Sequence, residues 1–99
     1  MKILLDMDET ITAQPEFFSA FSHAMKNAGH EIHVVTARDP LTEKLTKDEL
    51  SKLNISYDVL SFDYEKLTYC EKNGIDVAFD DGQFWFHGKR WSDIKIFFF

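Results

Sequence analysis

The sequence is poor in cysteine, in long apolar runs and in basic residues, and each shortage excludes a class of protein. The single cysteine, Cys70, cannot form an internal disulfide, and its helical context favours a small buried residue over a nucleophile. No stretch approaches the roughly 20 apolar residues of a membrane span. Eleven Lys and Arg against 17 Asp and Glu give a net charge of −6, which excludes a general nucleic-acid coat but not a site for one phosphate.

The chain length and composition are those of one small globular domain. The 99 residues leave no room for a second domain, and 44% hydrophobic with 28% charged residues argues against disorder. The first apolar residues meet an acidic cluster at once, so we expect no signal peptide and a cytoplasmic protein without a membrane partner.

Apolar patterning predicts strands that alternate with helices. Short apolar runs predict strands over 3–5, 31–36, 57–62, 76–79 and 94–99. Helical spacing predicts helices over 15–28 and 64–73. Between them, Leu41 and Leu45 lie on one face of a predicted short helix, and residues 46–49 fit a capping box that starts another turn. This order predicts an α/β fold whose parallel sheet is joined by right-handed crossovers.

Polar residues follow three of the predicted strands at the point where each strand ends. In open parallel sheets, ligands bind just beyond these carboxyl ends. Four carboxylates, a hydroxyl and an arginine would meet there: Asp6, Asp8, Asp80, Asp81, Thr36 and Arg38. Carboxylates this close would repel one another, and Mg²⁺ is the simplest remedy because it prefers oxygen ligands. A solvated acidic turn explains one such strand end but not three.

Asp6 and Asp8 are two residues apart, so in an extended backbone both side chains point to one face. One carboxylate could then attack as a nucleophile while its neighbour transfers protons.

These residues resemble the motifs of the haloacid-dehalogenase (HAD) superfamily. The sequence DMDET at 6–10 resembles its first motif, Asp-x-Asp-x-Thr, and Thr36 at the end of an apolar strand resembles the second. Lys66 resembles the third motif, and the pair 80–81 resembles the fourth. The resemblance spans residues 1–82, looks nearest to the nucleotidase-like branches, and implies a three-layer Rossmann-like (HAD-like) parallel sheet with helices on both faces. Residues 1–99 would form a single catalytic domain.

The resemblance implies a phosphatase that works through an aspartyl-phosphate. Asp6 would attack phosphorus, and Asp8 would protonate the leaving oxygen and later deprotonate water. Thr36 would bond a phosphoryl oxygen, and Lys66 would offset the developing charge. Lys72 is a rival for this last role, but a lysine near a helix C-terminus is ordinarily structural.

The resemblance also implies a Mg²⁺ cofactor and a set of substrate contacts. The metal ligands would be Asp6, Asp8 through its backbone carbonyl, Asp81, and Asp80 directly or through water. The residues expected to contact substrate are Thr36, Ala37, Arg38 and Lys66. For Arg38 two interpretations stay open, a grip on a second anionic group or a surface pair with Asp39 or Glu9.

The spacing of the motifs leaves no room for the cap domain that most superfamily members carry. Thr36 lies thirty positions after Asp6, and Lys66 lies thirty positions after Thr36, so we expect a capless enzyme with an open site. A nucleotide or a phosphorylated nucleic-acid end is then a plausible substrate, given Arg38, the basic pair 89–90 and the aromatics. The alternatives are a catalytically silent phosphate- or metal-binding regulatory module and a structural domain with an incidental acidic edge.

Seven of the 15 aromatic residues fall in the last 16 positions. Residues 84–86 either close the core or offer a stacking face for a nucleobase. The final three phenylalanines could bury against a partner subunit, which would make the protein a homo-oligomer.

Overall fold

The computed structural model describes residues 1–81 and 95–98, which form a five-stranded, all-parallel sheet in the order β3-β2-β1-β4-β5. The strands are β1 (Lys2–Asp6), β2 (Glu31–Thr36), β3 (Val59–Phe62), β4 (Val77–Asp80) and β5 (Lys95–Phe98). The helices are α1 (Pro15–Asn27), α2 (Glu43–Lys52) and α3 (Lys66–Asn73), and two short turns, η1 (Met7–Ile11) and η2 (Pro40–Thr42), follow β1 and β2.

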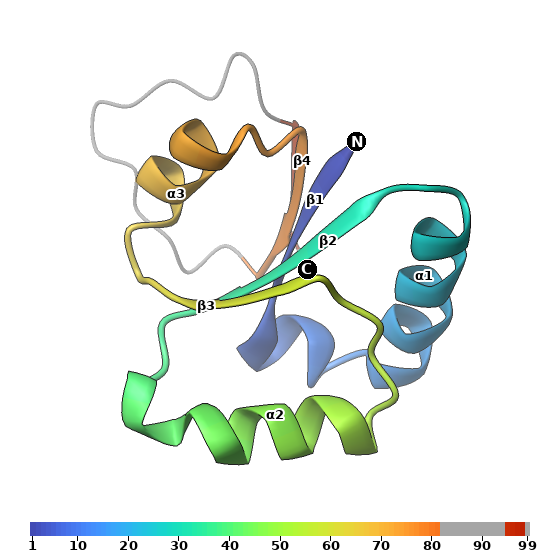
Figure 1. The fold of residues 1–99 in the computed structure, drawn as a ribbon, viewed down its shortest axis with the longest axis vertical. Coiled ribbons are helices and arrows are strands. Elements are labelled where there is room, and N and C mark those ends of the chain that lie inside the picture. The colour runs from blue at the N-terminus through green and yellow to red at the C-terminus, as the bar shows by residue number, and fades with distance from the viewer. Residues whose placement is uncertain (82–94, 99) are drawn as a thin grey trace.

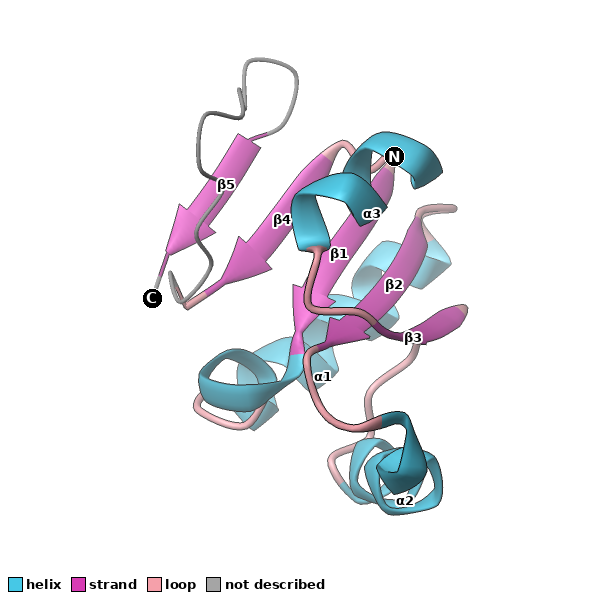
Figure 2. Ribbon diagram, turned by 90° about the vertical axis from the view of Figure 1, so that its left-hand side faces the viewer, coloured by secondary structure: helices cyan, strands magenta, loops and turns pink. Residues whose placement is uncertain are grey.

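Helices cover both faces of the sheet because the central strands are apolar on both sides. Leu5 of β1 belongs to a buried cluster with Phe18 of α1 and Leu50 of α2. Leu4, its neighbour, belongs to a second cluster with Tyr69 of α3. Alternate residues of a strand point to opposite faces, so these clusters are the two halves of the core. Figures 1 and 2 show α3 on one side of the sheet and α1 on the other. The predicted α/β fold with a parallel sheet is confirmed.

Two predicted elements begin two residues later than the sequence indicates. The third strand begins at Val59 instead of residue 57, and the third helix begins at Lys66 instead of residue 64. The helix is delayed because the Asp63 carboxylate accepts the backbone N–H of Glu65 at 2.8 Å, which closes a turn before the first helical residue. This turn places Lys66 at the start of α3.

The segment after β2 differs from its predicted structure. Leu41 and Leu45 do not form a buried face, since they are 93% and 71% exposed. Thr46 does not begin a new helix; it lies buried inside the continuous helix α2. The Asp39 carboxylate caps the segment instead, because it accepts the backbone N–H of Leu41.

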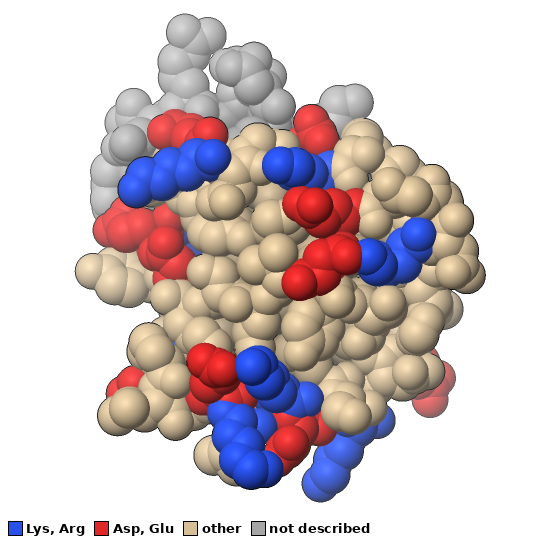
Figure 3. Space-filling model, in the orientation of Figure 1, with Lys and Arg blue, Asp and Glu red and all other residues tan. Residues whose placement is uncertain are grey.

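The outer surface of α2 is charged, in keeping with this orientation. Lys44 pairs with Asp48, and Lys47 pairs with Glu43, each pair one helical turn apart. Figure 3 shows basic and acidic side chains intermingled along this helix at the lower edge of the molecule.

The stretches that join the central strands contain few elements. Between β1 and β2 lie η1 and α1, and between β2 and β3 lie η2 and α2.

Across the described ranges 1–81 and 95–98, every helix is too short or too polar to cross a bilayer. A strand is confirmed at 95–98, parallel to β4. The stacking or core role expected for residues 84–86, and the substrate role of the basic pair 89–90, lie outside the described residues.

The orientation of α2 predicts a sharp contrast between two of its leucines. Leu50→Ala removes a fully buried side chain, so we expect it to lower the free energy of unfolding by about 2–5 kcal/mol. Leu45→Ala removes an exposed one, so its effect should stay within about 0.5 kcal/mol. Urea unfolding followed by circular dichroism measures both. Equal losses in the two variants would contradict this packing.

Candidate functional site

Three carboxylates meet where β1 and β4 end. Asp6 is the last residue of β1, Asp80 is the last of β4, and Asp81 follows it. The two strands are paired in parallel, so their carboxyl ends lie at one edge of the sheet. One oxygen from each of the three carboxylates lies within 4.8 Å of the other two, with Asp6 and Asp80 buried and Asp81 half-buried. Folding thus gathers acidic groups that repel one another at this distance.

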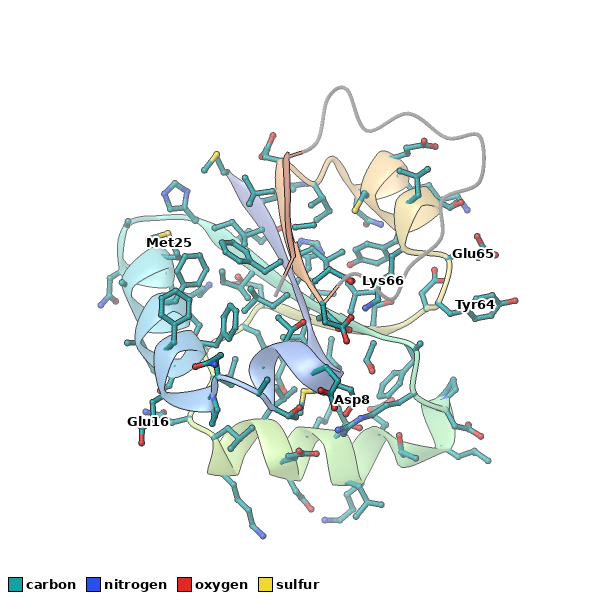
Figure 4. The ribbon with its side chains drawn as sticks, turned by 180° about the vertical axis from the view of Figure 1, so that it is seen from behind. Asp8, Glu16, Met25, Tyr64, Glu65 and Lys66 are labelled. Atoms are coloured by element: carbon teal, nitrogen blue, oxygen red, sulfur yellow. The ribbon has the colours of Figure 1, made fainter. Side chains whose placement is uncertain are left out.

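A buried lysine stands among these carboxylates. Lys66 is only 2% exposed, and its Nζ lies 2.5 Å from Oδ1 of Asp6 and 3.8 Å from Oδ2 of Asp80. Figure 4 shows Lys66 turned inward beside the end of β4, whereas Tyr64, two residues earlier, points outward. Lys72, the rival for this place, lies exposed in the last turn of α3. The lysine that meets Asp6 is therefore Lys66.

The Asp6 carboxyl feels two opposed influences. Burial raises its pKa because the charged form loses hydration, and the negative charge of Asp81 adds to this effect. The ammonium group of Lys66 works against both, and so does Thr10, whose hydroxyl donates to Oδ2 of Asp6 at 3.2 Å. One oxygen of Asp6 therefore faces Lys66 and the other faces Thr10.

Asp8 lies in the interrupted turn η1, with a partner of its own. Its backbone is extended, and the next residue, Glu9, has a φ of 63°, in the left-handed region that favours glycine. The Glu9 backbone N–H donates to the Thr12 hydroxyl at 3.0 Å, which holds this bend. The Asp8 side chain lies outside the three-carboxylate cluster and binds Arg38.

Arg38 holds Asp8 with two hydrogen bonds. Its Nε donates to Oδ2 of Asp8 at 2.9 Å, and one terminal nitrogen donates to Oδ1 at 2.6 Å. The other terminal nitrogen donates to Glu49 at 2.9 Å and to Thr46 at 3.2 Å. The hydrogen bonds from Arg38 lower the pKa of the Asp8 carboxyl, and these carboxylates in turn raise the pKa of the guanidinium group.

Both contacts of Arg38 with α2 differ from the sequence-based expectation. The partners expected for a surface pair were Asp39 and Glu9, but the carboxylates that bind Arg38 are those of Asp8 and Glu49. Thr46 and Glu49 are three residues apart in α2 and therefore share one face of the helix. This spacing could have predicted a shared partner, but it also fits a capping box at a helix start.

The remaining predicted site residues lie at the same edge of the sheet. Thr36 ends β2, next to β1, and is buried, and its hydroxyl oxygen accepts the backbone N–H of Arg38 at 3.2 Å. Ala37 is exposed beside it. Cys70, by contrast, lies on the buried face of α3, where burial raises the pKa of its thiol to about 12, as expected of a structural cysteine.

The donor set of the cluster fits a hard divalent cation. Asp6, Asp80 and Asp81 offer oxygen ligands only, and among the described residues the cation within 4 Å of any of the three is Lys66. Magnesium and calcium prefer such all-oxygen sites. These three residues could therefore hold a metal ion, to which the Asp8 side chain does not contribute as it lies here.

Comparisons with protein-family models, with characterised proteins and with solved structures give no match to this chain. Any functional conclusion must therefore come from the residues of the site and their geometry.

Removal of the buried lysine tests the electrostatics of the cluster. Lys66→Met leaves buried carboxylates without their counter-charge, so we expect a loss of about 3–5 kcal/mol in metal-free buffer at pH 7. Without Lys66 the already raised pKa of Asp6 rises further. A carboxyl with a higher pKa in the folded than in the unfolded state gains a proton as the pH falls, so the loss should shrink toward about pH 5.

Urea unfolding at both pH values measures this effect, and Lys72→Met is the matched control. Because Lys72 is exposed in the last helical turn, its removal should cost less than about 1 kcal/mol at either pH. A loss for Lys66→Met that does not depend on pH would contradict the electrostatic cause.

Proposed function

We propose that this protein is a Mg²⁺-dependent phosphomonoester hydrolase of the HAD type, with an aspartyl-phosphate intermediate. The observation that carries the proposal is the buried contact between Lys66 and Asp6, with Asp80 and Asp81 beside it. A lysine 60 positions away in sequence meets the first aspartate, as the resemblance of the motifs requires. The strand order β3-β2-β1-β4-β5, which doubly wound nucleotide-binding sheets use, supports a HAD-like Rossmann fold.

The proposed metal site consists of Asp6, Asp80 and Asp81, with the backbone carbonyl of Asp8. A bound Mg²⁺ would supply positive charge that offsets these carboxylates and the phosphate of the substrate. The exclusively oxygen donor set supports this choice of ion.

Asp6 and Asp8 would divide the chemistry between them. A carboxylate oxygen of Asp6 forms a bond to phosphorus as the ester P–O bond breaks, and the leaving oxygen takes a proton from Asp8. A water molecule then attacks phosphorus, gives its proton to Asp8, and breaks the bond to Asp6, so inorganic phosphate leaves and Asp6 is restored. Lys66, already in contact with Asp6, would offset negative charge on the phosphoryl group, and the Thr36 hydroxyl would bind one of its oxygens.

The absence of a cap supports a bulky substrate. Within residues 1–81 the stretches before β2 and β3 hold only the turns and helices already described, so no inserted domain covers the carboxyl edge of the sheet there. The substrate, or a partner protein, would then exclude water from the site. A nucleotide or a phosphorylated nucleic-acid end fits this requirement.

A metal- or phosphate-binding module without turnover is the second candidate. One observation favours it: both oxygens of Asp8 accept hydrogen bonds from Arg38 and so are engaged away from the three-carboxylate cluster. Turnover assays separate the two candidates directly.

Removal of the proposed nucleophile should abolish turnover. We expect Asp6→Asn to lower phosphate release from 4-nitrophenyl phosphate with Mg²⁺ by about 10³-fold or more, since an amide cannot take the place of the carboxylate that forms the covalent intermediate. Asp39→Asn is the control at the same edge, because an amide oxygen can still cap the turn, and it should retain wild-type activity. Wild-type protein that releases no phosphate from aryl phosphates, nucleotides or phosphorylated oligonucleotides would refute the proposal.

Magnesium should stabilise the folded protein through the carboxylate cluster. A ligand at a hundredfold excess over its Kd adds about 2.7 kcal/mol to the stability of the folded state, so the Tm should rise by several degrees. We expect Asp81→Asn to lose most of this rise. Asp76→Asn alters the opposite end of β4, where Asp76 accepts the backbone N–H of Lys2, and should keep it. Differential scanning calorimetry with MgCl₂ or EDTA measures the shift, and an equal shift in both variants would place the ion elsewhere.

A further inference from the structure

Arg38 links the predicted catalytic edge of the sheet to helix α2. Its guanidinium group donates to both oxygens of Asp8, at 2.6 and 2.9 Å. A planar fork that meets a carboxylate through two parallel bonds fixes both its position and its plane. The Asp8 carboxylate, whose side chain is 54% exposed, is therefore held in one orientation although it lies near the surface.

The guanidinium group of Arg38 also donates hydrogen bonds to helix α2. Thr46, which is fully buried in α2, accepts from Arg38 at 3.2 Å, and Glu49 accepts from the same nitrogen at 2.9 Å. Arg38 thus contacts acceptors on two separate elements at once, and rotation of its side chain would break contacts with both. The orientation of Asp8 in the turn η1 consequently depends on a helix that lies about 40 positions later in the sequence.

We propose that Arg38 is a positioning residue that orients Asp8 for hydrolysis of the aspartyl-phosphate. This inference rests on the proposed function, and it gives Arg38 a role different from the substrate contact that the sequence predicts. Asp8 must act as an acceptor in that step: the water oxygen bonds to phosphorus, the water proton moves to Asp8, and the bond from phosphorus to Asp6 breaks. Both oxygens of Asp8 accept N–H groups of Arg38, which favours the ionised carboxylate, the form that can accept a proton from water.

The choice of substrate isolates this step. The 4-nitrophenolate ion leaves phosphorus without needing a proton, so formation of the aspartyl-phosphate from 4-nitrophenyl phosphate depends little on Asp8. Release of phosphate from Asp6 depends on Asp8 fully. A defect in the orientation of Asp8 should therefore lower kcat, which includes phosphate release, and spare kcat/KM, which ends at the first irreversible step.

The test is Arg38→Lys, which keeps the positive charge and removes the planar fork. We expect kcat for 4-nitrophenyl phosphate to fall about 10-fold or more, while kcat/KM stays within about threefold, because small misplacements of a catalytic group are costly. The fraction of covalently phosphorylated protein in the steady state, measured by intact mass spectrometry after acid quench, should rise above that of the wild type. Lys47→Met removes another cation of α2, paired with Glu43 on the exposed face, and should change neither quantity.

Glu49→Ala provides a second variant that leaves the contact between Arg38 and Asp8 in place and removes one anchor. It should change kcat and the phosphorylated fraction in the same direction by a smaller factor. Equal falls in kcat and kcat/KM without accumulation of the phosphorylated protein would overturn the positioning role, and so would unchanged kinetics in Arg38→Lys. Absence of turnover in the wild type would refute the proposed function itself, and the positioning role with it.

Discussion

The candidate site depends on one buried ion pair, between Lys66 and Asp6. Both side chains are nearly inaccessible to solvent, and ionised groups leave water only at a cost that a close partner can offset. Lys66 also lies near Asp80, so a single ammonium group stabilises the meeting of two strand ends. The start of α3 matters for this ion pair. The turn closed by Asp63 makes Lys66 the first residue of the helix, and from there its side chain reaches Asp6 at the edge of the sheet.

The sheet could be predicted well because each of its strands has a clear signal in the local sequence. The central strands are buried on both faces, so they appear in the sequence as continuous apolar runs, and the polar residues that end them mark one edge of a parallel sheet. The meeting of Asp6 and Asp80 follows from that topology once the strands are parallel, whereas the place of Lys66 depends on the turn closed by Asp63.

The position of α2 was harder to predict because its signals conflict. Leu41 and Leu45 have helical spacing yet face solvent, and Thr46 resembles a helix cap yet lies inside the helix. Tertiary contacts decide which face of α2 is buried. Leu50 packs into the same core cluster as Phe18 of α1. Thr46 and Glu49 accept hydrogen bonds from Arg38, which places them beside the site. Contacts between a loop and a helix form only when the chain packs, so local sequence patterns do not predict them.

Two carboxylates separated by one residue end in opposite electrostatic environments. Burial raises the pKa of Asp6, while the hydrogen bonds of Arg38 lower the pKa of Asp8. The pKa of Asp6 is raised chiefly because burial removes hydration from its charged form; the negative charge of Asp81 adds to this, and Lys66 opposes both. A bound cation would act in the same direction as Lys66. Asp8 has its counter-charge already, from Arg38, so it needs no metal to remain ionised. An ionised Asp8 is ready to accept the proton of water in the second step of the proposed mechanism. To protonate the leaving oxygen in the first step, Asp8 would have to gain a proton, and its contact with Arg38 opposes that gain.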